Sequence, residues 1–138
     1  MATTTATLSV SSDIMTYPIN ISKTMVMNKL GTCTGLDETS GLRAKKFRNT
    51  TAVVVVEQDE FTSTKASKVY MRNTGSNSTE FFYVAKHASA AAAATDGETI
   101  GKLYGGDWML IPYLADVNIT VAPNTTNVMT LEYMVFAE

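Results

Sequence analysis

The sequence predicts an all-β fold, an antiparallel β-sandwich or a jelly-roll-like barrel with an extended N-terminal arm. Three runs alternate between apolar and polar residues with the period of two that a half-buried strand requires: residues 69–72, 117–121 and 129–136. Turn-forming residues separate the short runs at intervals typical of sandwiches and barrels. The chain has 138 residues, which is the size of one domain with its own core. We therefore divide it into an arm at residues 1–12 and a single sandwich domain at residues 13–138.

The first two predicted strands lie on either side of Pro18. Leu8 and Val10 alternate with small polar residues before the proline, and Ile19 and Ile21 do so after it. The arm itself is uncharged and rich in threonine, so it has little apolar area with which to fold back on its own domain. Its backbone can instead add a strand to the sheet edge of a neighbouring molecule. We predict that the arm binds a partner through Thr3, Thr4, Thr5 and Thr7.

Residues 28–41 contain three glycines among polar residues and are predicted to form a loop, with one short strand at 32–36. The segment at 42–48 is the densest basic run of the chain. As a strand it carries charge on both faces, which an edge strand tolerates. Two interpretations stay open for this run: a solvated sheet edge, or contact with an acidic partner surface. Such a contact would use Arg43, Lys45, Lys46 and Arg48.

Residues 52–56 form the most apolar run, with four consecutive valines that favour a strand over a helix. The lack of alternation there predicts burial on both faces, and hence a central strand. Two alternating runs flank a turn-like segment within residues 68–87, which we interpret as a β-hairpin. Residues 88–94 are almost all alanine, so a short helix and a loop both remain open.

Gly105, Gly106 and Asp107 predict a turn between two apolar strands, because glycine tolerates positive φ and Asp can bond to its own backbone. Pro112 cannot donate a ladder hydrogen bond, so it should end a strand or lie at a sheet edge. The inward positions of the predicted strands define an expected core, which consists of Val54, Val56, Leu103, Trp108, Leu110, Ile119, Val121, Leu131, Tyr133 and Val135.

The sequence offers no motif for catalysis. His87 is the single histidine, and no ligand cluster at metal-binding spacing accompanies it. Cys33 lies among Thr and Gly, without a basic neighbour that would activate its thiol. The segment 96–98 lacks the ligand series of an EF-hand, and the glycines of 101–106 match neither the dinucleotide nor the P-loop motif. We therefore expect no enzymatic activity, no cofactor, no metal and no small-molecule substrate.

Four aromatic residues allow two interpretations, a carbohydrate- or protein-binding face or ordinary core and cross-strand pairs: Tyr70, Phe81, Phe82 and Tyr83. The net charge of −2 gives no reason to expect a nucleic-acid partner or an anionic membrane surface. The first residues lack the basic and apolar segments of a signal peptide, and no apolar run approaches the length of a membrane helix.

The second half of the chain carries a resemblance. Segments of residues 68–138 resemble small virion structural proteins of tailed bacteriophages, similar to capsid decoration (cement) proteins and some tail proteins. The segments are KVYMRNTG at 68–75, EFFYV at 80–84, IGKLYGGDWMLIP at 100–112, VNITV at 117–121 and LEYMVF at 131–136.

The resemblance implies a compact β-fold that assembles in many copies and has no catalytic residues. It implies a non-enzymatic decoration protein that stabilises a bacteriophage head through contacts between subunits. The expected partners are other copies of the chain and a major capsid or other virion protein, and the expected location is the virion, assembled in the host cytoplasm. A tail, neck or fibre component and a carbohydrate- or ligand-binding sandwich remain alternatives.

Overall fold

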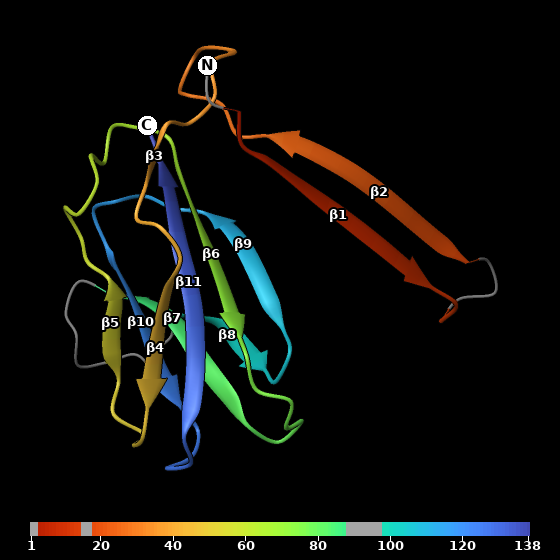
Figure 1. Ribbon diagram of the computed structural model, residues 1–138, viewed down its shortest axis with the longest axis vertical. Helices are drawn as coiled ribbons and strands as arrows, with labels where there is room; N and C mark the ends of the chain where they lie inside the picture. Colours follow the sequence, from red (N-terminus) through yellow and green to blue (C-terminus); the bar gives the residue numbers. More distant parts are fainter. Residues whose placement is uncertain (1–2, 15–17, 88–97) are drawn as a thin grey trace.

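The computed structural model describes residues 3–14, 18–87 and 98–138, and for His87 the backbone alone. The described residues form eleven strands and no helix, which confirms the all-β prediction (Figure 1). The strands are β1 (Thr5–Ser12), β2 (Ile19–Val26), β3 (Glu38–Thr39), β4 (Arg43–Phe47), β5 (Val53–Val56), β6 (Ser67–Asn73), β7 (Phe81–His87), β8 (Thr99–Tyr104), β9 (Trp108–Pro112), β10 (Asn118–Pro123) and β11 (Met129–Ala137).

Strands β4 to β11 form a sandwich with a jelly-roll arrangement. One sheet has the order β4-β11-β6-β9, with the short β3 paired to β11 beside β4, and the other has the order β5-β10-β7-β8. All neighbouring strands are antiparallel. Consecutive strands alternate between the two sheets, except β7 and β8, which pair with each other. This double-sheet winding of eight strands is that of a jelly roll, one of the two predicted architectures.

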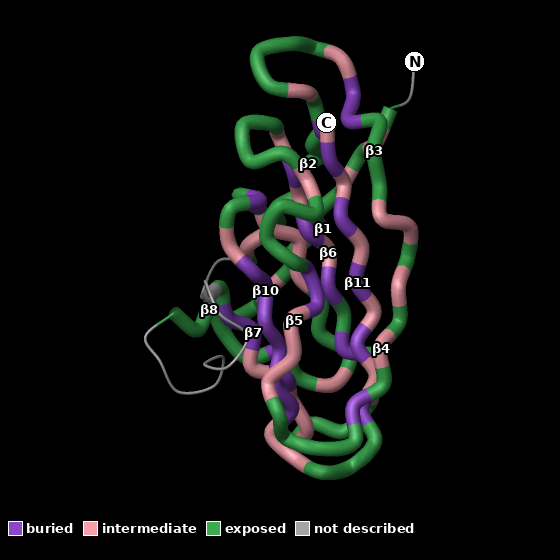
Figure 2. The backbone as a smooth tube through the Cα atoms, turned by 90° about the vertical axis from the view of Figure 1, so that its left-hand side faces the viewer, coloured by how far each residue is buried: buried purple, intermediate pink, exposed green. Residues whose placement is uncertain are grey.

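The core lies between the two sheets and follows the predicted alternation along β11. The odd-numbered residues of β11, from Met129 to Ala137, point inward and are buried, and the even-numbered ones are half-buried on the outer face. Figure 2 shows the buried positions gathered along β6, β10 and β11 in the middle of the molecule. Seven of the predicted core residues are buried: Val56, Leu103, Ile119, Val121, Leu131, Tyr133 and Val135.

Three predicted core residues are not in the core. Val54 and Leu110 are half-buried, and Trp108 is 50% exposed. On β9 the inward positions are Met109 and Ile111, which lie opposite the buried residues of β6. The prediction therefore placed β9 in the wrong register by one residue, because both faces of this strand are apolar and the alternation does not mark the inner one.

Two predictions of strand position are wrong. Within the described residues β5 pairs with β10 alone, so it is an edge strand and not a central one. Its residues Val55 and Val56 are buried and Val53 and Val54 are half-buried, so burial comes from packing between the sheets rather than from two flanking strands. Residues 68–87 are not a hairpin, since β6 and β7 belong to opposite sheets and the turn between them crosses the sandwich.

The glycine turn and Pro112 behave as predicted. Gly106 has φ of 87°, and Asp107 closes the turn between β8 and β9 because its N–H donates to the carbonyl of Tyr104 over 2.9 Å. Pro112 is the last residue of β9, the edge strand of its sheet.

The loop at 28–41 contains its strand at β3 rather than at 32–36. The alanine-rich segment 88–94 lies outside the described residues.

A separate two-stranded sheet projects from the sandwich. Strands β1 and β2 pair antiparallel over eight residues each and extend away from the body as a hairpin (Figure 1). A lone extended arm over residues 1–12 is not confirmed, because β1 is paired along its whole length. The projecting element includes β2 and so crosses the expected boundary between residues 12 and 13.

Candidate functional site

The hairpin of β1 and β2 is amphipathic. Its register places Val10 opposite Ile21, on the same face as Leu8, whereas the other face carries small polar pairs such as Ser9 opposite Ser22. The apolar face is uncovered, since Leu8, Val10 and Ile21 are each at least 40% exposed. A two-stranded hairpin is marginally stable in water by itself. The exposed apolar face therefore indicates a surface for contact with another molecule.

The sheet of β6, β9 and β11 has a second apolar surface on its outer face. Leu110, Tyr70 and Met134 stand side by side across the three strands in one row. Phe136 and Trp108 lie on the same face in the rows on either side. Because each strand alternates, these side chains point away from the core and toward the hairpin.

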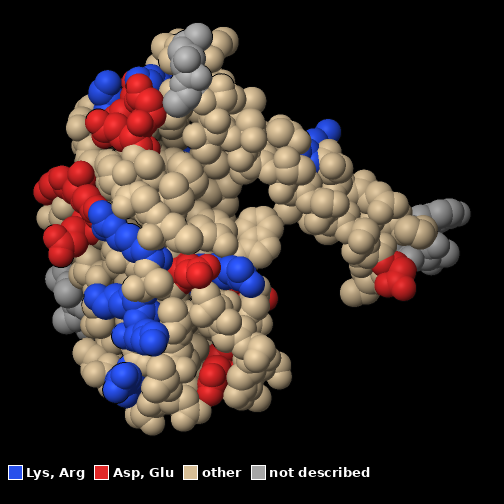
Figure 3. All heavy atoms as spheres, viewed as in Figure 1, with Lys and Arg blue, Asp and Glu red and all other residues tan. Residues whose placement is uncertain are grey.

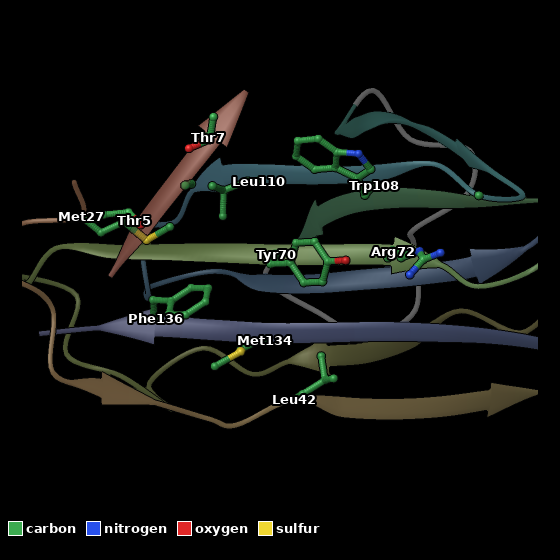
Figure 4. A pocket seen from close by; sticks show the side chains of 12 residues that line it. Thr5, Thr7, Met27, Leu42, Tyr70, Arg72, Trp108, Leu110, Met134 and Phe136 are labelled. Atoms are coloured by element: carbon green, nitrogen blue, oxygen red, sulfur yellow. The ribbon is translucent and has the colours of Figure 1, made fainter. Parts of the chain in front are cut away.

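The hairpin and this outer face enclose a groove of about 560 Å³, within the usual size range of ligand sites. A second groove of about 310 Å³ continues along the hairpin, where Leu8 and Met25 line it together with Trp108. Figure 4 shows the Tyr70 ring in the middle of the first groove, with Leu110 on one side and Met134 on the other. The first groove is lined by Thr5, Ala6, Thr7, Met27, Leu42, Tyr70, Arg72, Gly106, Trp108, Leu110, Met134 and Phe136.

The base of the hairpin is closed by a backbone hydrogen bond and joined by another to the loop that follows it. The N–H of Met27 donates to the carbonyl of Thr4, and the N–H of Leu36 donates to the carbonyl of Met27, both over 2.9 Å. Met27 and Leu36 are each 2% exposed, so the junction is buried. The base of the hairpin is thus buried, whereas nearly all residues of its two strands are exposed.

The side chain of Glu138 holds the loop that follows the hairpin. Its Oε2 accepts hydrogen bonds from the N–H groups of Leu30 (3.1 Å) and Ala66 (3.3 Å), and its Oε1 lies 3.3 Å from the ammonium of Lys65. The hydrogen bond from Leu30 is the main reason that the pKa of the Glu138 carboxyl lies below its usual value. The ionised form of Glu138 therefore stabilises this junction.

The predicted partner-binding threonines lie at the root of the hairpin. Thr5 and Thr7 line the groove, and the hydroxyl of Thr7 lies 3.0 Å from that of Thr24 on β2. Thr4 takes part in the junction, and Thr3 is exposed just before β1. Among the described strands β1 pairs with β2 alone, so its other edge offers open backbone groups. Their contact with a partner remains a prediction.

The predicted basic residues lie on β4 and just after it, at the sheet edge opposite β9. Arg43 has a partner in its own chain, because its Nη2 lies 2.6 Å from the Glu60 carboxylate, whose hydrogen bond raises the pKa of Arg43 above its usual value. Lys45 is half-buried, whereas Lys46 and Arg48 are exposed. Figure 3 shows most of the visible Lys and Arg side chains on the sandwich, on the side away from the hairpin, which carries few charges. The structure therefore does not bring the threonines and the basic run together.

The four aromatic residues singled out in the sequence do not form one face. Phe82 is buried in the core. Phe81 and Tyr83 pack edge to face on β7 at 4.9 Å between ring centroids, and the ammonium of Lys102 lies 4.7 Å from the Phe81 centroid. Tyr70 lies on the opposite sheet, in the groove. Of the four, Tyr70 is the one that belongs to the candidate site.

The described residues offer little for metal or acid–base chemistry. They contain no group of three or more His, Cys, Asp and Glu side chains that could hold a metal ion. Cys33 is an exposed free thiol. The side chain of His87 and residues Asp96 and Gly97 lie outside the described part. Every buried side-chain nitrogen or oxygen in that part has a hydrogen-bond partner.

Residues 3–14, 18–87 and 98–138 also contain no helix that is long and apolar enough to cross a membrane. Comparison with protein families, with curated proteins and with solved structures finds no match to this chain. The candidate site therefore has to be interpreted from its own geometry.

Sequence reasoning missed the groove itself. Its floor comes from the outer positions of β6, β9 and β11, and Trp108 and Leu110 were placed in the core. One pattern in the sequence marks it: Met134 and Phe136 occupy positions that alternation assigns to solvent, yet they are large and apolar. A strand that is apolar on both faces at one end indicates a second contact surface outside the core.

Proposed function

We propose that this protein is a non-enzymatic structural component of a multi-copy assembly, and that the assembly is a tailed-bacteriophage virion with this chain as a decoration protein on the head. The observation that carries the proposal is the projecting hairpin, whose exposed apolar face has no function within a single chain. An exposed apolar surface of this kind is unfavourable for a monomer in water, and it promotes association. The groove beside the hairpin provides a second surface of the same character.

The jelly roll supports this setting by analogy alone. Jelly rolls recur in viral capsid proteins, and also in lectins and cupins, so the fold is compatible with a shell component without specifying one. The resemblance of residues 68–138 to small virion proteins points to the first of these uses.

The basic edge supplies a surface for the shell. Lys46 and Arg48 are exposed on a chain with a net charge of −2, so they form a local positive region on an otherwise acidic molecule. A single exposed ion pair contributes about 0–1 kcal/mol, but many copies on one particle add their contributions through avidity. We propose that this edge faces an acidic surface of the shell.

Location on the particle tests the proposal directly. Gold-labelled antibody against this chain is applied to particles purified from a culture that expresses the gene, and electron microscopy locates the label. Label on heads supports the decoration protein. Label on tails, necks or fibres assigns the chain to that alternative, and particles without label overturn the virion assignment.

A charge-reversal variant tests the basic edge. K46E/R48E is expected to weaken attachment to heads several-fold and to reduce its salt dependence, because exposed charges are screened over about 10 Å at 0.1 M salt. K86E, which reverses an exposed charge on β7 in the other sheet, is the control and should bind as the unmodified protein does. Unchanged binding of K46E/R48E across the salt series would assign the run to a solvated edge.

Tyr70 and Trp108 in the groove favour a second candidate, a carbohydrate- or ligand-binding module. Aromatic side chains that line a concave site suit the faces of sugar rings, and lectins also use jelly rolls. Titration with a panel of oligosaccharides, followed by the emission of Trp108, separates the candidates. A saturable change at constant oligomeric state favours the binding module, and no change leaves the assembly role as the better interpretation.

A further inference from the structure

The chain leaves two matching apolar surfaces uncovered. One is the hairpin face that carries Leu8, Val10 and Ile21, and the other is the outer sheet face with Tyr70 and Trp108. The solvent-accessible surface of the chain is 8144 Å², whereas a folded monomer of this mass exposes roughly 7,000 Å². The open hairpin contributes to this excess, because nearly all of its residues are exposed on both faces.

We propose that the hairpin of one copy docks on the outer face of β6, β9 and β11 of a second copy, with its apolar side chains in the groove. This inference rests on the proposed assembly function and names the contact between neighbouring copies. The hairpin of the same chain stands beside this face without filling the groove, since the two line it together and leave about 560 Å³ between them.

A second copy is an occupant that covers the hairpin face and the outer sheet face at the same time. Each copy gives one hairpin and receives one, so both surfaces are covered in a closed dimer or ring. Each of the two surfaces carries one charged side chain, since Lys23 lies opposite Leu8 on the apolar hairpin face and Arg72 lines the groove. The other residues that line the groove are apolar or small and polar, apart from the hydroxyl of Tyr70. A mainly apolar occupant with few charges suits such a groove better than a strongly charged shell surface does.

The area of contact is sufficient for a specific complex. Two strands of eight residues each present a face of roughly 27 by 10 Å. Reciprocal exchange between two copies covers two hairpin faces and two sheet faces, or roughly 1,000 Å² in all, which reaches the lower limit of specific interfaces. Association is therefore expected in the micromolar range rather than as an inseparable dimer.

Trp108 provides the readout, because it is the single tryptophan of the chain, is 50% exposed, and lines both grooves. Docking of a second hairpin covers its ring. We expect sedimentation to show association as the concentration rises, with a shift of tryptophan emission to shorter wavelength over the same range. A chain that stays monomeric through the high micromolar range overturns the proposal.

A matched pair of variants on the hairpin tests the face. V10D/I21D places two carboxylates on the apolar face, and S9D/S22D places them one residue away on the polar face, at neighbouring cross-strand pairs. V10D/I21D should raise the dissociation constant roughly 30-fold or more, as expected for hot-spot positions. S9D/S22D should associate as the unmodified chain does. Equal effects of the two variants, or none from V10D/I21D, contradict docking through the apolar face.

A mixing experiment distinguishes docking in the groove from packing of two hairpins against each other. V10D/I21D retains the groove and its Trp108, and W108D retains the hairpin but has no tryptophan. Neither variant should associate well alone. Mixed, the intact hairpin of W108D should dock on V10D/I21D and shift the emission of the one remaining tryptophan. No shift in the mixture, while both variants keep the circular dichroism spectrum of the unmodified chain, overturns the assignment of the groove.

The hairpin exchange and the virion assignment can fail independently of each other, and the experiments distinguish the two failures. A chain that remains monomeric but labels phage heads overturns the hairpin exchange and leaves the decoration role in place. A chain that associates as expected but is absent from particles retains the exchange and loses the virion assignment.

Discussion

The side chain of Asn73 donates a hydrogen bond from Nδ2 to the carbonyl oxygen of Leu103 over 3.1 Å, and this bond joins the two sheets of the sandwich. Asn73 is 1% exposed and ends β6, and its Oδ1 accepts from the N–H of Gly75 over 3.0 Å. The backbone of Asn73 also exchanges hydrogen bonds with the turn at Gly106 and Asp107. The buried side chain of Asn73 thus fixes the end of β6 beside the turn that contains Gly106, which lines the groove.

Asn73→Ala is expected to destabilise the protein by about 1–3 kcal/mol, because it leaves the buried carbonyl of Leu103 and the N–H of Gly75 without their partners. Urea unfolding followed by circular dichroism measures the change. Asn77→Ala is the control, since Asn77 is exposed and bonds within its own turn to Thr79. A loss for Asn73→Ala no larger than that for Asn77→Ala contradicts the role of Asn73 as a link between the sheets.

Gly105→Ala is expected to destabilise the protein by about 1–3 kcal/mol through overpacking. A Cβ at Gly105 would lie 2.6 Å from the backbone oxygen of Asn77 and 2.9 Å from its nitrogen, so the backbone itself would have to move. Gly101→Ala is the matched control on β8, where a Cβ meets nothing within 4 Å. Thermal unfolding of the two variants should differ, and equal midpoints would show that the β8–β9 turn yields without cost.

Glu138→Gln is expected to destabilise the junction at neutral pH, and the difference from the unmodified protein should vanish in acid. The folded-state pKa of Glu138 lies below its unfolded value of about 4.5, so the carboxylate contributes stability above that value and loses it as pH falls through the folded pKa. Thermal unfolding between pH 7 and pH 3 measures this. Glu132→Gln removes a charge from β11 without the contacts to Leu30 and Ala66, and should show no comparable convergence.

The sequence predicted the parts of the fold that alternate and missed those that depend on pairing. The alternation of 129–136 identified the inner face of β11, because its outer positions begin as polar residues such as Thr130 and Glu132. On β9 both faces are apolar, so the same reasoning misplaced Trp108. The valine run of β5 indicated burial but not position, since packing between sheets buries an edge strand as well as a central one.

The candidate site was predictable in its hairpin and not in its groove. The alternation around Val10 and Ile21 is visible in the sequence, but it does not predict that the two strands pair with each other. The groove needs the register of β6, β9 and β11 together, and that register is set by the jelly-roll winding rather than by any local pattern. The basic run was correctly placed at a sheet edge, whereas the ion pair of Arg43 with Glu60 depends on tertiary structure.

The exposure of the hairpin predicts how its amides exchange with solvent. Strands β1 and β2 have no covering layer, while β11 pairs with β4 and β6 and buries alternate residues in the core. Amides open with a local free energy that ranges from about zero at unsupported elements to the global value in the core. In dilute, monomeric protein we expect hydrogen exchange to be fast for Thr5–Ser12 and Ile19–Val26 and slow for Met129–Ala137.

Association should change this pattern in one place. When a second copy covers the apolar face, opening of the hairpin also requires its release, so exchange of β1 and β2 should slow as the concentration rises while β11 changes little. Hydrogen exchange with mass spectrometry at a low and a high concentration measures both segments in one sample. S9D/S22D should keep the concentration dependence and V10D/I21D should lose it. Protection of the dilute hairpin as strong as that of β11 would mean that the hairpin is stable without a partner.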